Sequence, residues 1–278
     1  KCIAVDETRQ GEGYAATIVT ALWKEAHARG RSHLFLYTTP ENAAMFSGLG
    51  FYTVARAENS LLMENRRNGI GQFLAGLPRP AVAGRVGAVV ANCNPFTLGH
   101  RYLVEHAAAR CDAVHLFILS EERSLFPAAA RLELARLGTA DLPNVLVHPT
   151  GGYLVSAATF PTYFLKDANP ENVRCELDLA VFAAHFAPHF NISVRFVGTE
   201  PISPVTDAYN RAMAQALPPR GIAVELVERK WINGGPVSAS RVRRLLAQGR
   251  LEDIRPLVPP TTYAYLASPP EKCPEQLP

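Results

Sequence analysis

The sequence has few of the features that mark disulfide-bonded, zinc-binding or membrane-spanning proteins. Its 278 residues hold five cysteines, an odd number, and no two of them are spaced as C-x-x-C. This count and spacing fit neither a disulfide framework nor a zinc site. No apolar run reaches the roughly 18 residues needed to cross a bilayer, and no secretory leader is visible. We therefore expect a cytoplasmic protein without a membrane partner.

An excess of charge of either sign is also absent. Lysine and arginine total 28 and aspartate and glutamate 25, which leaves a net charge of +3. Such a small value does not indicate a nucleic-acid partner or an anionic membrane surface. Apolar residues make up 48% of the chain and charged residues 19%. This composition can build a sizeable core, in one large domain or two smaller ones.

The chain has no internal repeat, and its regular feature is an alternation of strand-like and helical segments. Apolar runs typical of buried strands occupy residues 86–91, 113–119, 145–148, 192–197 and 222–227. Helical stretches occupy residues 100–111, 128–137, 177–186, 207–217 and 240–248. The alternation predicts an α/β fold with a parallel sheet covered on both faces. We assign residues 85–267 to a Rossmann-like doubly wound domain, whose ligands bind beyond the carboxyl ends of the strands.

Residues 1–60 predict a smaller α/β unit. Strand-like segments at 2–5, at 33–37 and after Gly50 are separated by two helical stretches. A glycine-rich turn, Gln10 to Ala15, leads from the first strand-like segment into the first helix. Because the chain opens at Lys1, without Met and directly in a strand-like segment, we expect part of this unit to be missing.

Two segments predict connections and not folded elements. Residues 61–84 contain a polar stretch at 65–69 and a stretch rich in glycine and proline at 76–84. We interpret them as a linker whose apolar side chains dock on a neighbour. Residues 268–278 contain four prolines and predict a flexible tail.

The segment from Asn92 to His100 joins a predicted buried strand to a predicted helix. Its sequence is Asn-Cys-Asn-Pro-Phe-Thr-Leu-Gly-His. Free N–H groups and the positive end of a helix attract anions at such a junction. We expect Gly99 to let the backbone approach a ligand closely, because it has no Cβ. Thr97 and His100 would add polar groups beside a phosphate.

A second strand–helix junction lies at Val237 to Arg243. Ser238 and Ser240 can cap the helix that follows, and Arg243 adds a cation. Two helix N-termini, each with hydroxyls and a cation, can hold a triphosphate between them.

Together, the two junctions resemble the T/H-x-G-H and I-S-S-T-x-x-R motifs of the adenylyltransferase superfamily, which transfers AMP from a nucleoside triphosphate. Residues 97–100 match the first motif. In the second, Val237 replaces isoleucine, Ala239 a serine and Ser240 a threonine. The resemblance implies ATP as a substrate.

The N-terminal turn carries a different resemblance. With Asn42, Phe46 and Gly50-Phe51 it is similar to the acyl-CoA-binding half of the GNAT acetyltransferase family. That family holds a pyrophosphate on this turn, which implies that a CoA-like arm is bound by Gln10, Gly11, Gly13 and Ala15.

A GNAT-like unit before an adenylyltransferase-like domain resembles the citrate lyase ligase family. Ala158–Lys166 and Val197–Pro201 are also similar to that family. The resemblance implies an AMP-forming acid–thiol ligase that uses ATP, Mg²⁺ and acetate. It would acetylate citrate lyase, on the thiol of a dephospho-CoA-like prosthetic group carried by the acyl-carrier subunit.

The resemblance also implies roles for single residues. We expect His100, Thr97 and Lys166 to act catalytically, by neutralising charge at the phosphates. The other expected ATP- and phosphate-binding residues are Asn92, Asn94, Phe96, Gly99, Gly198, Glu200, Ser238, Ser240 and Arg243. No residue is assigned to a metal.

Several alternatives stay open. A cofactor-biosynthetic adenylyltransferase, acting on a phosphopantetheine or a nucleotide, would share the phosphate-binding residues, although it would not need a GNAT-like unit. Residues 1–60 fit either an arm-binding module or an incomplete acetyltransferase. Lys166 and Glu200 also fit ordinary surface or turn roles, Arg131 fits a surface pair on its helix, and Cys93 fits a small buried residue.

Overall fold

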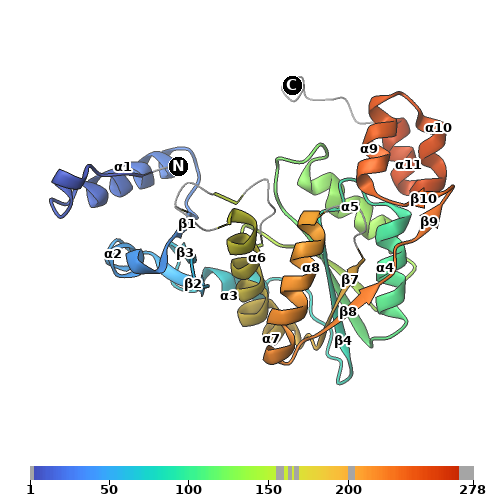
Figure 1. Ribbon diagram of the computed structural model, residues 1–278, viewed down its shortest axis with the longest axis horizontal. Helices are drawn as coiled ribbons and strands as arrows, with labels where there is room; N and C mark the ends of the chain where they lie inside the picture. The colour runs from blue at the N-terminus through green and yellow to red at the C-terminus, as the bar shows by residue number, and fades with distance from the viewer. Residues whose placement is uncertain (1–2, 155–159, 162–164, 166–168, 200–203, 269–278) are drawn as a thin grey trace.

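The computed structural model describes residues 3–154, 160–161, 165, 169–199 and 204–268. They form a five-stranded parallel sheet in the order β6-β5-β4-β7-β8, a three-stranded antiparallel sheet in the order β1-β3-β2, and a short two-stranded ribbon, β10-β9 (Figure 1). The large sheet lies within residues 85–267, and its parallel strands confirm the predicted α/β class.

The parallel strands are β4 (Val86–Ala91), β5 (Ala113–Ile118), β6 (Val145–Pro149), β7 (Val194–Gly198) and β8 (Ala223–Val227). Strand β4 lies at the centre because it is apolar on both faces. Val86 and Ala88 pack into one hydrophobic core, and Val89 packs into another on the opposite face. A strand buried on both faces appears in the sequence as a continuous apolar run.

Helices cover both faces of this sheet. One face carries α4 (Leu98–Ala108) and α5 (Ala128–Gly138). The other carries α6 (Pro170–Val181), which continues through a π-helical turn (Phe182–Phe186) into α7 (Ala187–Phe190), and α8 (Pro204–Ala216). This is the predicted doubly wound arrangement.

A small helical cap follows β8. It consists of the hairpin β9 (Trp231–Ile232) and β10 (Gly235–Pro236) and the helices α9 (Ala239–Ala247), α10 (Leu251–Ile254) and α11 (Pro260–Ala267). Its own hydrophobic cluster includes Val237 and Val242 together with Phe126, which lies two residues before α5 begins. The cap is therefore fixed against the end of the sheet where α4 and α5 start (Figure 1).

The N-terminal unit contains α1 (Tyr14–Ala28), β1 (Phe35–Thr38), α2 (Ala43–Gly48), β2 (Tyr52–Arg56), β3 (Leu61–Glu64) and α3 (Gly69–Ala75). Its strands are antiparallel, and β3 lies between β1 and β2. Short 3₁₀ turns occur at Glu7–Arg9, Pro40–Asn42, Pro218–Arg220 and Arg255–Leu257.

Two sequence-based boundaries of this unit are wrong. Residues 61–75 are not a linker, because Leu61 to Glu64 form the central, fully buried strand of the small sheet and α3 follows it. Three consecutive apolar residues at 61–63 need partners on both faces, which a linker cannot offer. Residues 3–5 form no strand. The expectation of a flexible tail at 268–278 falls almost entirely outside the described residues.

The small sheet shares a core with the large domain. Val54 and Leu62 belong to the same buried cluster as Phe117 and Phe182 of the large domain. The opposite face of the small sheet packs on α1 and α2 through Val19 and Phe46. Within the described part of the chain, no helix combines the length and apolar character needed to cross a membrane.

Candidate functional site

The candidate site lies where the order of the large sheet reverses direction along the chain. From β4 the chain goes to β5 on one side, whereas β7 pairs with β4 on the other side. A crevice opens beyond the carboxyl ends of two such strands, because their connections leave in opposite directions. The segment 92–97 follows β4 and leads into α4, and residues 198–199 end β7. The predicted site segments therefore lie at this position.

A capping box shapes the start of α4. The hydroxyl of Thr97 accepts the His100 N–H at 3.4 Å, and the Thr97 N–H donates to Nδ1 of His100 at 3.0 Å. Such reciprocal bonds hold the first helical turn in place. Since Nδ1 accepts a backbone N–H, it carries no proton. The remaining nitrogen, Nε2, is then the protonated one in neutral imidazole.

The His100 ring is kept neutral by its surroundings. Burial, with a further contribution from the nearby Arg229 cation, lowers the pKa of His100 to about 4. At neutral pH the side chain is therefore a hydrogen-bond donor without charge. A neutral donor can bond to a phosphate oxygen and strengthen that bond as negative charge develops.

The Phe96 ring packs against the His100 imidazole. It stacks on the imidazole with centroids 5.8 Å apart and planes 21° apart, and it has no exposed surface. A fully buried ring offers no surface to a ligand, so binding of ATP or phosphate by Phe96 stays a prediction. The ring fixes the orientation of the imidazole.

Gly99 brings the two predicted motifs together. A Cβ at this position would lie 2.6 Å from the carbonyl oxygen of Val237. We expected the absent side chain to admit a ligand, but the group that approaches is the backbone before α9. The two helix N-termini are thus in direct backbone contact, which no local sequence pattern states.

The second motif is attached to the first by Arg243. Its Nη1 donates to the Asn94 carbonyl at 2.6 Å, and its Nη2 donates to the Ser240 hydroxyl at 3.1 Å. Ser238 caps α9 by accepting the Arg241 N–H at 3.2 Å. The hydroxyls of Ser238 and Ser240, the free N–H groups of α9 and the half-buried Arg243 therefore form one basic, polar surface beside α4.

Arg131 was left open from the sequence, and the surface role suggested for it is wrong. It is fully buried, at 0% exposure, and lies under the turn after β4. It donates to the carbonyls of Asn92 (2.8 Å), Leu119 (2.7 Å) and Phe126 (3.0 Å) and to that of Glu121. One guanidinium therefore joins the carboxyl ends of β4 and β5.

The side chains of Asn92 and Asn94 build the turn. Asn92 accepts from Arg131 at 2.5 Å and donates to Glu121 at 3.1 Å, and Asn94 accepts the Phe126 N–H at 3.1 Å. Their side-chain contacts therefore orient the turn, and their contact with ATP stays a prediction.

Two cations near the site were missed in the sequence. Arg229 and Lys230 follow β8, and Arg229 donates its Nε to the Thr199 carbonyl at 2.6 Å, which joins the ends of β7 and β8. The ammonium of Lys230 lies 5.9 Å from the centre of the Tyr102 ring on α4. Their position directly after a predicted strand was the available signal.

The other predicted residues have different outcomes. Gly198 ends β7 at the crevice, and its carbonyl accepts from the Asn210 side chain at 3.0 Å. Lys166 and Glu200 lie outside the described residues. The turn of Gln10, Gly11, Gly13 and Ala15 lies at the start of α1, at the opposite end of the molecule from α9 (Figure 1). Binding of an arm by this turn stays a prediction.

Comparison with known proteins agrees with the site. A family model described as the citrate lyase ligase C-terminal domain matches residues 86–266. The chain belongs to the citrate lyase ligase family. It is 45% identical over 273 residues to the citrate (pro-3S)-lyase ligase of Klebsiella pneumoniae, with 96% of this chain and 80% of the relative covered. The resemblance inferred from the two motifs is thereby confirmed.

Two further relatives match very different shares of the chain. The citrate (pro-3S)-lyase ligase of Escherichia coli (strain K12) is 43% identical over 275 residues, with 96% of this chain and 78% of the relative covered. A phosphopantetheine adenylyltransferase of Staphylococcus carnosus is 38% identical over 64 residues, which cover 22% of this chain and 40% of that enzyme. The ligase relatives therefore match nearly the whole chain, and the adenylyltransferase matches less than a quarter of it.

Proposed function

We propose that this chain is an AMP-forming ligase that activates citrate lyase. It joins acetate to ATP, releases pyrophosphate, and transfers the acetyl group to a thiol on the lyase. That thiol belongs to the dephospho-CoA-like prosthetic group of the acyl-carrier subunit. Two relatives that match 96% of the chain are named citrate (pro-3S)-lyase ligases. A reducing cytoplasm would keep the acceptor thiol free, and neither nucleic acid nor a membrane takes part.

The first step is an attack on the α-phosphate. An acetate oxygen forms a bond to the α-phosphorus, the bond to the β-bridging oxygen breaks, and pyrophosphate leaves. Such a step needs charge neutralisation and an in-line path, and it needs no covalent nucleophile of the protein. His100, as a neutral Nε2–H donor, would bond to the phosphates beside Thr97. Ser238, Ser240 and Arg243 would hold the departing pyrophosphate.

The second step is acyl transfer. The thiolate of the prosthetic group attacks the carbonyl carbon of acetyl-AMP, the bond from that carbon to the phosphate oxygen breaks, and AMP leaves. The thiol proton goes to solvent. The chain's own Cys93 takes no part, because it is 1% exposed and burial raises the pKa of its thiol.

The observation that carries the proposal is the contact between the two helix N-termini. The Gly99–Val237 approach and the Arg243–Asn94 hydrogen bond place two anion-attracting helix ends side by side. Lys166 and Glu200 stay proposed contacts of the nucleotide. Among the described residues no group of three His, Cys, Asp or Glu side chains could hold a metal. Mg²⁺ would enter with the nucleotide, and we assign it no step.

The alternative acceptor is a phosphopantetheine or a nucleotide. It would use the same phosphate contacts, and the match to a phosphopantetheine adenylyltransferase is its support. The far larger coverage by the ligase relatives favours the acid–thiol reaction.

AMP formation from ATP tests the proposal. Purified chain is mixed with ATP, acetate and the thiol form of citrate lyase, and AMP is measured with and without each component. We expect AMP only when acetate is present, together with recovery of citrate lyase activity. AMP transfer to phosphopantetheine without any carboxylate would establish the alternative instead.

A further inference from the structure

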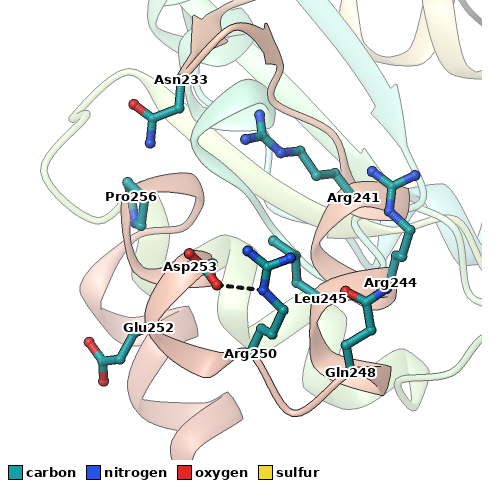
Figure 2. A pocket seen from close by; sticks show the side chains of 9 residues that line it. All are labelled: Asn233, Arg241, Arg244, Leu245, Gln248, Arg250, Glu252, Asp253 and Pro256. Carbon is teal, nitrogen blue, oxygen red and sulfur yellow. Dashed lines mark hydrogen bonds and ion pairs between the residues drawn. The ribbon is translucent and has the colours of Figure 1, made fainter.

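The cap contains a basic hollow whose lining residues have no role in the two proposed steps. It has a volume of about 610 Å³ and is lined by side chains of α9, of α10 and of the hairpin turn at Asn233 (Figure 2). Residues 239–257 contain five arginines and two acidic residues. Three of those arginines, Arg241, Arg244 and Arg250, line the hollow.

The positive charge of the hollow is concentrated on one wall. Arg250 is paired with Asp253 at 2.7 Å (Figure 2). Glu252 accepts from the Tyr263 hydroxyl at 2.8 Å. On the opposite wall, Arg244 is exposed, and within the described part of the chain it has no hydrogen-bond or ion-pair partner. Its cationic group is therefore available to a ligand.

Arg241 lies near Arg244 on α9, and hydrogen bonds fix its guanidinium. Its Nη1 donates to the carbonyls of Ile232 (2.9 Å) and Gly235 (3.3 Å), which fixes the guanidinium at the wall of the hollow. The two arginines are three residues apart on α9 and so share one face of the helix. Two planar guanidinium groups at this spacing suit a pair of adjacent anionic groups better than a single charge.

The hollow is continuous with the proposed pyrophosphate-binding residues. A neighbouring hollow of about 350 Å³ shares Asn233, Arg241 and Arg244 with it and is also lined by Ser238 and Ser240. An anionic group seated between Arg241 and Arg244 would thus lie near Ser238 and Ser240, which we propose hold the departing pyrophosphate.

We propose that this hollow is a second diphosphate-binding site, separate from the nucleotide clamp formed by the N-termini of α4 and α9. The inference rests on the proposed function, because that reaction supplies two diphosphate groups. One belongs to the dephospho-CoA-like arm of the acceptor, and the other is the pyrophosphate after its release. Arg241 and Arg244 are the residues that bind it.

Calorimetric titration of the full chain tests the site. The clamp is first saturated with α,β-methylene-ATP, and then dephospho-CoA, inorganic pyrophosphate or pantetheine is titrated. We expect at least one diphosphate compound to bind, and pantetheine, which has no phosphate, not to bind. Arg244→Gln should weaken that binding at least tenfold, whereas Arg220→Gln, which removes the same charge from an exposed residue outside the cap, should not change it.

Dephospho-CoA and pyrophosphate distinguish the two possible sources of the bound diphosphate, the acceptor arm and the leaving group. Binding of dephospho-CoA assigns the hollow to the acceptor arm, and binding of pyrophosphate alone assigns it to the leaving group. Absence of binding by both, or equal weakening by the two variants, overturns the site. The titration needs neither acetate nor turnover, so it is independent of the ligase assay. A chain that forms no AMP but still binds a diphosphate would refute the ligase reaction and would not contradict the second site.

Discussion

His100 is the residue on which the proposed chemistry depends most. Its Nδ1 is occupied by the Thr97 N–H, so only Nε2 faces a ligand. Removing one such donor to developing charge costs about 10²–10³ in rate. We expect His100→Ala to lower AMP formation by that factor while the chain stays folded, with a loss in stability of about 0.5–2 kcal/mol from its half of the capping box. Near-normal turnover in this variant would remove His100 from the site.

The protonation state of His100 gives a pH prediction. Because burial lowers its pKa to about 4, the imidazole stays neutral from pH 8 down to about pH 5. The turnover number should therefore show no histidine titration between pH 6 and 8. A rate that rises as the pH falls through 6.5 would mean that the charged form is the active one.

Arg131 tests whether a buried cation organises the turn. Arg131→Met leaves four buried carbonyls without this donor, and one unsatisfied buried polar group alone costs roughly 1–3 kcal/mol. Arg136→Met, on the same helix but half-exposed, is the matched control and should change the free energy of unfolding by less than about 0.5 kcal/mol. Urea unfolding measures both. Similar values for the two variants would contradict the buried role.

At the scale of helices, the nucleotide clamp depends on the close approach of the N-termini of α4 and α9. Gly99→Ala places a Cβ against the Val237 carbonyl, where neither backbone can yield easily. We expect the helix ends to separate, with a loss of about 1–3 kcal/mol in stability and a raised KM for ATP. Gly48→Ala, with nothing within 4 Å of the new Cβ, should leave both unchanged. An unaltered KM in Gly99→Ala would mean that the helix contact is not part of nucleotide binding.

The sequence predicted those features of the site that are local. A cap at Ser238 or Ser240 follows from residue types at a strand–helix junction, and Ser238 is the residue that caps α9. The Gly99–Val237 contact joins residues far apart in the chain, so no short pattern contains it. A single arginine inside a helix is typical of a surface residue, and only the fold reveals that Arg131 is buried.

The small sheet illustrates the same limit for the fold. The polar residues after β3 and the proline-rich stretch beyond α3 made residues 61–84 resemble a linker. Strand order in an antiparallel sheet depends on pairing between distant segments. Here β3 pairs with β1 on one side and with β2 on the other, which no local pattern predicts. Deleting residues 1–60 would therefore leave a buried strand without partners, and substitutions at Gln10 test arm binding more cleanly.

At the scale of the whole molecule, a buried histidine pair links stability to pH. His115 on β5 and His148 on β6 are both 1% exposed and share a 2.8 Å hydrogen bond. Burial lowers their pKa values to about 3 and about 4, and for His115 the neighbouring histidine lowers it further. Because the unfolded chain binds more protons below pH 6.5, the free energy of unfolding falls as the pH drops.

The expected loss is about 2–3 kcal/mol for each histidine between pH 6.5 and 4.5. Melting temperatures across this range measure it. The exposed His27 provides the control, and His27→Gln should keep the wild-type pH dependence, whereas His115→Leu with His148→Val should flatten it. A melting temperature of the wild-type chain that is constant from pH 7 to 4.5 would contradict the neutral buried pair.

Acid-by-acid exchange of labelled pyrophosphate into ATP tests the central claim most directly. The clamp formed by α4 and α9 should catalyse exchange that depends on a carboxylic acid, fastest with acetate, without any citrate lyase present. Arg243→Met should reduce this exchange strongly, because it removes both the cation and the bond to the Asn94 carbonyl. Exchange that proceeds equally without acid, or that appears only with a phosphorylated acceptor, would contradict the account.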